Sequence, residues 1–551
     1  MPLFKEVKKP VIRQTAAAGA EISPLRPRYS EKTPPCISHC PNENDIRGWV
    51  TTIAQAEAYG RTNEQALELA WNKVTDFNPF PAICGRVCPH PCEADCNRKN
   101  KDGAVAINAL ERFIGDFGIE KGLKLSALTE EKRPEKIAII GSGPAGLSCA
   151  YQLSRRGYPV TIFEAFSQPG GMLRYGIPKY RLPREVLDTE IQRILDLGAE
   201  LKCNFVVGKD TTLEKLRQEY RAIFVGIGAH KGLTLGVPGE DASNVFTGTE
   251  FLNQANSGEN VEIGGKVVVI GGGDTAIDAA RVSKRLGADV TILYRRTRAE
   301  MPAIAPEIDG ALEEGIAIEF LATPTEVIRN NGTAVGLKCI RMELGEPDKS
   351  GRPRPVPKAG SEFNIDATTI IAAISQEPEF SPVAELREGR DWIKTDEWGA
   401  TKSEGIYAGG DDVELALVAT AVYQGRLAAQ AIDSSLGGGE LKKPSEHPVA
   451  DKVNLDWYKE QARNERKHLP VEKRTMDAEI ESGLSEAEAL DEAKRCMSCG
   501  MCMDCETCWM YCTNNCFVRL PKGEHYKIKL EVCNGCKKCA EECPCGYIEM
   551  V

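Results

Sequence analysis

The sequence lacks several features that would assign it to common classes of protein. It contains no uninterrupted apolar stretch long enough to cross a membrane. Residues 1–14 mix lysine, glutamate and proline and show no apolar signal core. The net charge of −11 at pH 7 disfavours nucleic acid as the main partner. These absences predict a cytoplasmic protein without a membrane span.

The middle of the chain has almost no cysteine. Residues 97–495 hold only Cys149, Cys203 and Cys339 of the 21 cysteines, and their apolar neighbours indicate core packing. Six cysteines lie between residues 36 and 96, and twelve lie between residues 496 and 545. In a large chain of this kind, cysteines clustered at short spacing indicate metal binding rather than disulfide bonds.

Residues 137–164 have the pattern of a dinucleotide-binding unit. An apolar strand leads into the glycine turn 141–146, then a helical pattern and a second strand that ends at Glu164. The first glycine permits a tight turn, the second lets the backbone reach a pyrophosphate, and the third lets the helix pack on the strand. Glu164 stands where a carboxylate binds the ribose hydroxyls of an adenosine. An ordinary glycine turn is the alternative.

A second unit of this kind differs at its end. The strand 266–270 leads into the turn 271–276, and the next strand ends in Arg295 and Arg296 instead of an acid. An acid repels a 2′-phosphate, whereas arginine binds it through paired, charge-assisted hydrogen bonds. The first unit therefore predicts FAD and the second predicts NADPH, unless the arginines are only solvated surface charges.

Cysteines near the N-terminus are spaced by four residues within two groups, which are Cys36 and Cys40, then Cys84, Cys88, Cys92 and Cys96. This spacing would place the second group on one helix face, but the prolines at 89 and 91 exclude a regular helix. We expect an irregular loop with thiolates turned inward around an iron–sulfur cluster. Zinc is the alternative, although zinc sites more often use C-x2-C pairs.

The C-terminal tail contains the most specific motif. The run Cys533-x2-Cys536-x2-Cys539-x3-Cys543-Pro544 matches the bacterial ferredoxin pattern. Cysteines 496, 499, 502, 505 and 508 step by three and allow several registers for the partner run, but only the one that starts at Cys502 ends in the x3 gap. The predicted ligands are Cys502, Cys505, Cys508 and Cys543 for one cluster and Cys512, Cys533, Cys536 and Cys539 for the other. Cys496, Cys499, Cys516 and Cys545 have no predicted role.

A chain of 551 residues is too long for one core and predicts several domains in an α/β fold. We expect a helical N-terminal iron–sulfur domain, two nested Rossmann-like nucleotide-binding domains and a bacterial ferredoxin-like α+β domain. The helical domain is predicted at 1–130, and its first 30 residues form a poorly structured arm. The FAD domain is predicted at 131–250 together with 366–440, and the NAD(P)H domain is inserted at 251–365. A linker at 441–490 leads to the 2[4Fe–4S] ferredoxin-like domain at 491–551.

Taken together, these motifs resemble the small subunit of glutamate synthase. The shared segments are 85–93, 141–146, 170–178, 271–276 with 294–296, and 409–411. The same module is found in dihydropyrimidine dehydrogenase and in NADH-dependent ferredoxin:NADP oxidoreductase. The added tail is similar to that of the iron–sulfur flavoproteins that accompany dissimilatory sulfite reductase in sulfur oxidisers.

The resemblance implies roles for individual residues. It places FAD against Gly141, Gly143, Pro144, Ala145, Gly146, Glu164, Gly171, Met172, Leu173, Gly410 and Asp411. It places NAD(P)H against Gly271, Gly273, Asp274, Thr275, Arg295 and Arg296. For an N-terminal cluster, Cys40, Cys88 and Cys92 match best, and the fourth ligand is either Glu111 or Cys84.

The sequence departs from this family at two places. The family usually has four cysteines before the first helix, and only Cys36 and Cys40 are present here, so we expect one of its two N-terminal clusters to be absent. Glu414 and Leu415 replace the family's Gly-Pro after the Gly-Asp turn, which puts the flavin contact there in doubt.

The predicted function follows from the cofactors. A nicotinamide delivers two electrons as hydride, clusters take one at a time, and a flavin does both. We expect an NAD(P)H:acceptor oxidoreductase subunit, without a catalytic side chain, that exchanges electrons with a ferredoxin or a larger redox enzyme. The alternatives are the electron-input subunit of glutamate synthase, which ordinarily lacks the tail, and a non-catalytic, cluster-carrying scaffold without flavin.

Overall fold

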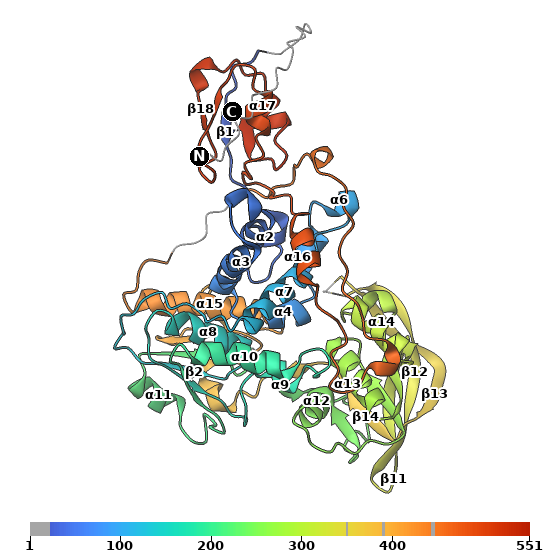
Figure 1. Ribbon diagram of the computed structural model, residues 1–551. Coiled ribbons are helices and arrows are strands. Elements are labelled where there is room, and N and C mark those ends of the chain that lie inside the picture. The colour runs from blue at the N-terminus through green and yellow to red at the C-terminus, as the bar shows by residue number, and fades with distance from the viewer. Residues whose placement is uncertain (1–21, 349–350, 388, 390–391, 442–446) are drawn as a thin grey trace.

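The computed structural model describes residues 22–348, 351–387, 389, 392–441 and 447–551 (Figure 1). A helical domain lies at the centre of the molecule, with the cysteine-rich C-terminal domain on one side and two parallel sheets with their helices on the other (Figure 1). Among the described residues, no helix combines the length and the apolar character that crossing a membrane requires.

The helical domain is built from short helices with local start signals. The Asp45 side chain caps the second of them, and Thr62 and Gln65 form a capping box on the third. The helices are α1 (Pro35–Ser38), α2 (Ile46–Ala54), α3 (Asn63–Phe77), α4 (Pro81–Val87), α5 (Pro91–Ala94), α6 (Lys99–Asp102) and α7 (Ile107–Glu120).

The cysteine ladder of residues 84–96 is not wholly the irregular loop that the prolines predict. Cys84 lies in α4 and Cys92 in α5, and the chain is irregular at residues 88–90 and again at 95–96, where Cys96 follows α5. Pro89 prevents α4 from continuing, but Pro91 occupies the first position of α5, where its missing N–H has no helical partner to lose. The result is two short helices that meet at a bend.

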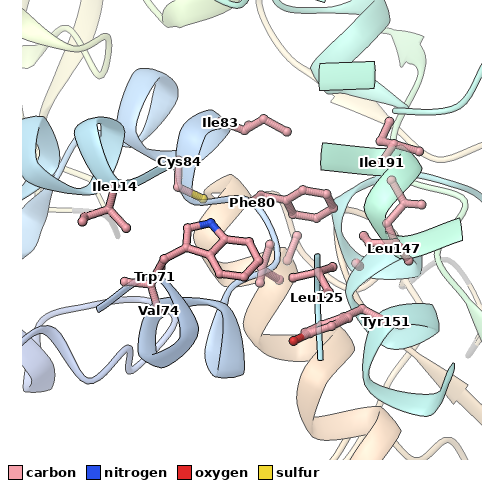
Figure 2. Close-up of a cluster of buried hydrophobic side chains, with 14 of the residues drawn as sticks. Trp71, Val74, Phe80, Ile83, Cys84, Ile114, Leu125, Leu147, Tyr151 and Ile191 are labelled. Atoms are coloured by element: carbon pink, nitrogen blue, oxygen red, sulfur yellow. The ribbon is translucent and has the colours of Figure 1, made fainter. Parts of the chain in front are cut away.

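One hydrophobic core runs from the helical domain into the first nucleotide-binding domain. Trp71, Phe80 and Ile83 pack toward Leu147 and Tyr151, and each side chain is at most 1% exposed (Figure 2). The Tyr151 hydroxyl also donates a hydrogen bond to the carbonyl oxygen of Thr75 over 2.8 Å. This continuous packing fixes the position of the N-terminal cysteines relative to the first sheet.

The first sheet is parallel, with the strand order β16-β5-β2-β3-β4. Its strands are β2 (Ile137–Ile140), β3 (Val160–Phe163), β4 (Glu200–Lys202), β5 (Ala222–Val225) and β16 (Ile406–Ala408). Its helices are α8 (Pro144–Ser154), α9 (Met172–Tyr175), α10 (Arg184–Leu195), α11 (Leu213–Glu219) and α15 (Val418–Ser435). Helices α8 and α15 approach closely at Gly425, where a Cβ atom would lie 2.2 Å from the Ala145 carbonyl oxygen.

The second sheet is inserted between strands of the first, and its order is β10-β9-β8-β14-β7. Its strands are β7 (Val245–Thr247), β8 (Lys266–Ile270), β9 (Asp289–Tyr294), β10 (Ala317–Phe320) and β14 (Thr369–Ala372), with helices α12 (Gly248–Asn256), α13 (Asp274–Arg285) and α14 (Ala305–Glu313). Because β14 pairs with both β8 and β7, this sheet extends beyond the expected range of 251–365 at both ends.

Smaller sheets complete the nucleotide-binding region. An antiparallel sheet contains β11 (Ala322–Asn330), β12 (Thr333–Pro347) and β13 (Pro353–Asp366). The strands β6 (Lys231–Gly232) and β15 (Gln376–Glu377) pair where the chain passes between the two large sheets. This pairing joins the two segments through which the chain enters and leaves the inserted sheet.

Residues 447–485 of the linker are mostly irregular, with short 3-10 helices at Leu455–Trp457 and Val471–Lys473. Helix α16 (Glu486–Ala493) follows and is capped by Ser485 and Glu488. The ferredoxin-like domain follows, with α17 (Thr507–Tyr511), α18 (Lys538–Glu541), β17 (Phe517–Arg519), β18 (Tyr526–Ile528) and β19 (Ile548–Met550).

The expected N-terminal arm of residues 1–30 is wrong in part. Residues 1–21 lie outside the described residues, but β1 (Pro27–Tyr29) pairs antiparallel with β19. Tyr29 stacks on Tyr547 at 5.1 Å between ring centroids. A three-residue strand between prolines gives no clear sequence signal, and its partner lies at the other end of the chain.

Candidate functional site

A cavity of about 300 Å³ opens at the carboxyl ends of the first sheet's strands. That edge is where parallel α/β sheets bind ligands. Ten of the eleven predicted FAD contacts line the cavity, which are Gly141, Gly143, Pro144, Ala145, Glu164, Gly171, Met172, Leu173, Gly410 and Asp411. Gly146 does not line it.

Each of the three positions of the first turn needs glycine for a different physical reason. Gly141 has φ +99°, and a Cβ atom there would lie 2.2 Å from the Gly226 carbonyl oxygen. A Cβ atom on Gly146 would lie 2.1 Å from the Gly141 carbonyl oxygen, so this glycine serves helix–strand packing. At Gly143 a Cβ atom would meet no protein atom within 4 Å, which leaves the backbone open to a ligand. These three environments fit a pyrophosphate-binding turn.

Glu164 is buried at the end of β3 and is fixed by the backbone around it. Its carboxylate accepts hydrogen bonds from the Ser142 N–H at 2.9 Å and from the Phe166 N–H at 2.8 Å, and also from the Ser142 hydroxyl. This network joins the glycine turn to the second strand, so the predicted ribose acceptor has a defined orientation.

The rest of the cavity wall comes from distant segments. Gly171 approaches the glycine turn so closely that a Cβ atom on it would lie 2.8 Å from the Gly143 Cα atom. Burial lowers the pKa of His230 to about 4, so its ring is neutral at pH 7. Burial raises the pKa of Asp411 to about 6, and its carboxylate accepts a hydrogen bond from the Ala416 N–H over 3.3 Å. The cavity thus combines apolar walls with few charges.

The second glycine turn, before α13, repeats the first in outline. Gly271 has φ +147°, and a Cβ atom there would lie 2.1 Å from the Ala373 carbonyl oxygen, while a Cβ atom on Gly273 would meet only the Pro302 ring, at 3.9 Å. The Asp274 carboxylate accepts a hydrogen bond from the Ile304 N–H over 3.0 Å, and burial raises its pKa. Thr275 follows in the first turn of α13.

The structure separates the two predicted phosphate-binding arginines. Arg295 is exposed at the end of β9. Arg296 is 3% exposed, pairs with the Asp348 carboxylate at 2.7 Å and donates to the Pro353 carbonyl oxygen over 2.8 Å. Arg296 therefore anchors the neighbouring antiparallel sheet, and Arg295 is the side chain available to a nucleotide.

A second cavity, in the helical domain, contains the best-matching N-terminal cysteines. Cys40, Cys88 and Cys92 line it together with Cys84 and Glu111. The buried Oδ1 atoms of Asn42 and Asn44 also belong to residues of its wall and have no hydrogen-bond partner among the described residues. Cys36 and Cys96, which are predicted with them, do not line this cavity, although they neighbour its cysteines in sequence.

Glu111 is better placed than Cys84 as the fourth member of this group. After burial, negative charge on Glu111 raises the pKa of Cys40 to about 11 and of Cys88 to about 12. The Asn78 amide donates to the Glu111 carboxylate over 3.0 Å and so fixes its orientation, while burial raises the pKa of Glu111 to about 7. Cys84 also interacts with Glu111, but it packs among Phe80, Ile83 and Trp71, and its S–H donates to the Asn78 side-chain oxygen over 3.8 Å (Figure 2).

The tail has two further cysteine-lined cavities. The first is lined by Cys502, Cys505, Cys508 and Cys543, with Cys545 beside them. The second is lined by Cys512, Cys533, Cys536 and Cys539, with Cys516 beside them. Each predicted ligand set is therefore brought together by the fold, and ligation by these residues stays a prediction.

Two of the cysteines without a predicted role touch predicted ligands. The Cys545 and Cys543 sulfurs lie 3.8 Å apart, and the Cys516 N–H donates a hydrogen bond to the Cys512 sulfur over 3.1 Å. N–H and S–H groups aimed at ligand sulfurs tune cluster potentials. The only sequence signal for this role is proximity to the run.

The spacing of the thiols disfavours zinc. A tetrahedral zinc with Zn–S bonds of about 2.3 Å brings its sulfurs to about 3.8 Å from one another. In the part of the chain that the structure describes, no three cysteine sulfurs lie within 4.8 Å of one another; the one group of potential ligands that close combines Cys502 with Asp504 and His525. No two cysteines among the described residues form a disulfide. Such wider groups fit clusters of several irons.

Comparisons with known proteins agree with this geometry. Residues 135–425 match the family described as pyridine nucleotide-disulphide oxidoreductase, and residues 3–123 match dihydropyrimidine dehydrogenase domain II, 4Fe-4S cluster. A relative in Geobacter sulfurreducens, NADPH-Fe(3+) oxidoreductase subunit beta, is 36% identical over 519 residues, which cover 86% of this chain and 76% of that protein.

Two further relatives are similar over most of their length. NADP(+)-dependent formate dehydrogenase subunit beta of Moorella thermoacetica is 38% identical, with 88% of this chain and 72% of that protein covered. The glutamate synthase [NADPH] small chain of Escherichia coli K12 is 36% identical, with 78% and 93% covered.

The fold, the flavin-type cavity and the cysteine-lined cavities define an FAD- and iron–sulfur-dependent NAD(P)H oxidoreductase. Electrons pass in it among NAD(P)H, FAD and [4Fe–4S] clusters, and its relatives are named as subunits of redox enzymes. The chain belongs to the pyridine nucleotide-disulphide oxidoreductase family. The enzyme interpretation of the sequence is confirmed over the scaffold alternative.

Proposed function

We propose that this chain oxidises NADPH and delivers the electrons singly to a ferredoxin or to a larger redox enzyme that binds its tail. When bound, FAD supplies the exchange between hydride and single-electron chemistry. The chain's own contribution is to hold the nicotinamide, the flavin and the clusters in fixed positions. We also propose a cytoplasmic location, where thiols in this number stay reduced.

One observation supports this route above the others. The start of α15 separates the flavin-type cavity from the cavity of Cys40, Cys88 and Cys92. Leu417 and Val418 line the first cavity, and Ala419 lines the second. A single turn of helix therefore stands between the two sites, and the packing of α15 on α8 keeps them in register.

Arg295 supports NADPH as the donor. A guanidinium at the end of β9 stands where the 2′-phosphate of a nucleotide on the second turn is expected, and its exposure leaves its donors available. Gly273 and the start of α13 offer open backbone N–H groups to the pyrophosphate.

An anaerobic titration of the complete, cluster-loaded chain with NADPH tests the proposal. We expect loss of the flavin absorption band and appearance of reduced-cluster signals in electron paramagnetic resonance (EPR). A Cys533→Ser, Cys536→Ser variant should still oxidise NADPH but reduce a bacterial ferredoxin at least about tenfold more slowly, with Cys203→Ser as the matched control. If NADPH bleaches neither the flavin nor the clusters, the proposal fails.

The glutamate synthase small subunit stays the second candidate, because the match covers 93% of the Escherichia coli chain. It predicts that a glutamate synthase large chain forms an active complex with this protein. It also predicts that the Cys533→Ser, Cys536→Ser variant supports that activity fully, since such subunits ordinarily lack the tail. Loss of activity in the variant would instead favour the tail as the electron outlet.

A further inference from the structure

Four cysteines from the two ends of the chain meet between the helical and the ferredoxin-like domains: Cys36, Cys96, Cys496 and Cys499. Cys36 lies in α1, Cys96 follows α5, and the other two follow α16. Burial, and then negative charge on Cys496, Cys499 and Cys96, raise the pKa of the Cys36 thiol. Burial and charge on Cys499 and Cys96 likewise raise the pKa of Cys496 to about 12. Cys36, Cys96 and Cys496 also pack against one hydrophobic core, and the Asn97 amide, next to Cys96, contacts the Cys499 sulfur, so the four thiols lie in one region.

Hydrogen bonds hold the three segments that carry these thiols. The Asn97 side-chain amide donates to the Cys499 sulfur over 3.4 Å, and the Lys32 N–H donates to the Gly500 carbonyl oxygen over 3.1 Å. Arg98 Nη1 donates to the carbonyl oxygen of Arg495, one residue before Cys496, over 2.7 Å. The backbone around the group is thus fixed by contacts that do not involve a metal.

A buried cation stands beside the group. Arg47 is 7% exposed, and its Nη1 atom donates to the carbonyl oxygens of Cys499 at 2.9 Å and Lys32 at 2.8 Å. Its charge lowers the pKa of Cys36, Cys496 and Cys499, against the larger effect of burial. Its Nε atom is buried without a hydrogen-bond partner among the described residues. A fixed cation with a spare donor suits a group of thiolates, which are negative when they bind metal.

Other uses of the four cysteines fit less well. None of them forms a disulfide. Among the described residues no three of these sulfurs come within 4.8 Å of one another, whereas zinc would need about 3.8 Å. Four thiols spaced more widely than zinc requires, with Asn97 and Arg47 in contact with Cys499, match a cluster of four irons better than a single ion.

The four cysteines are close in sequence both to the cysteines of the helical-domain cavity and to those of the first tail cavity. Residues 36–40 and 92–96 link it to the cavity of Cys40, Cys88 and Cys92, and residues 499–502 link it to the first tail cavity. The Tyr458 hydroxyl donates a hydrogen bond to the carbonyl oxygen of Met497, one residue after Cys496, over 2.8 Å. After burial, the pKa of Tyr458 is raised by charge on Cys545, Cys499, Cys496 and Cys505, which belong to both groups of thiols.

We propose that Cys36, Cys96, Cys496 and Cys499 bind a [4Fe–4S] cluster that connects the N-terminal cluster to the tail. The C-x2-C pair that this chain lacks before its first helix is supplied from the start of the tail. This replaces the expectation that one of the two N-terminal clusters is absent. The inference rests on the proposed electron-transfer function. In that function each NADPH supplies two electrons, and two one-electron acceptor molecules take them up.

Metal analysis of the complete chain, purified and reconstituted without oxygen, tests the site. With four clusters we expect about 16 iron ions and equal acid-labile sulfide per chain. Cys499→Ser combined with Cys496→Ser should leave about 12, retain one FAD and lose one spin per chain in the EPR signal of dithionite-reduced protein. Cys36→Ser, at the other end of the chain, should weaken or remove the same signal. Cys203→Ser should change none of these values.

Two results would overturn the site. One is about 12 irons in the unaltered chain, with the four thiols open to alkylation by a maleimide. The other is unchanged iron and spin in the Cys496→Ser, Cys499→Ser variant. Retained FAD and an unchanged circular dichroism spectrum separate loss of the cluster from misfolding.

The same preparation separates failure of the site from failure of the proposed function. A chain with about 16 irons whose clusters are reduced by dithionite but not by NADPH would keep the site and reject the function. A chain with about 12 irons that NADPH does reduce would keep the function and reject the site.

Discussion

Arg98 donates a hydrogen bond from Nη1 to the carbonyl oxygen of Arg495 over 2.7 Å, and so joins the helical domain to the start of the tail. Arg495 is fully buried and donates in turn to the carbonyl oxygens of Asp102, Gly103 and Ala104. Its Nη1 atom also pairs with the Glu492 carboxylate at 2.6 Å. A planar guanidinium with this many fixed acceptors holds the tail in one position.

Replacing Arg495 by methionine should loosen this junction. The change leaves Glu492 buried without its partner, and breaking a buried ion pair costs about 3–5 kcal/mol. We expect faster hydrogen–deuterium exchange at residues 495–500 and a lower unfolding temperature, measured on the loaded protein. Lys494→Met, one residue away and exposed, is the control and should change neither quantity. Equal exchange in both variants would show that the junction is held by other contacts.

The parts of this structure that the sequence predicts are those with local causes. The turn 141–146 is set by glycines whose missing side chains make room for nearby backbone, and the period of the flanking strands is local as well. The tail cysteines follow a fixed spacing, and the fold brings both predicted sets together. The distinction between Arg295 and Arg296 depended on Asp348 in another sheet, and no local pattern indicates it.

The junction between the chain ends could not be predicted for the same reason. Cys36 and Cys499 are separated by hundreds of residues. Neither the C-x3-C spacing at Cys36 nor the C-x2-C spacing at Cys499 indicates which other cysteines complete the set of four ligands. Likewise, β1 pairs with β19 through a register that only the folded tail provides. Where a site is assembled from both ends of a chain, spacing within each end shows half of the ligands.

Alanine at two glycines of the first turn should separate ligand binding from folding. A methyl group on Gly143 meets no protein atom within 4 Å but enters the cavity, so we expect FAD affinity to fall at least about tenfold, or about 1.4 kcal/mol, with little loss of stability. On Gly146 it would lie 2.1 Å from the Gly141 carbonyl oxygen, and we expect destabilisation of about 1–3 kcal/mol. Flavin fluorescence and thermal unfolding measure the two effects. Full FAD retention in Gly143→Ala would move the pyrophosphate elsewhere.

Glutamate at the two arginines after β9 should give different defects. Arg295→Glu should raise the KM for NADPH about 10–100-fold and leave that for NADH nearly unchanged, because only NADPH carries the 2′-phosphate. Arg296→Glu removes a buried ion pair and should mainly lower the unfolding temperature. Steady-state kinetics with both nucleotides and calorimetry separate the outcomes. Equal changes in both KM values for Arg295→Glu would reject the phosphate contact.

The fourth ligand of the cavity in the helical domain can be decided by two substitutions. Glu111 interacts electrostatically with all four cysteines of the cavity, whereas Cys84 packs in the core and its S–H donates to the Asn78 side-chain oxygen (Figure 2). Glu111→Ala should therefore release about one iron per chain, because the iron without a protein ligand becomes labile. Cys84→Ala removes one buried sulfur and should cost stability, about 1–2 kcal/mol, without loss of iron. Iron analysis and EPR spectroscopy distinguish them, and loss of iron from Cys84→Ala alone would reverse the assignment.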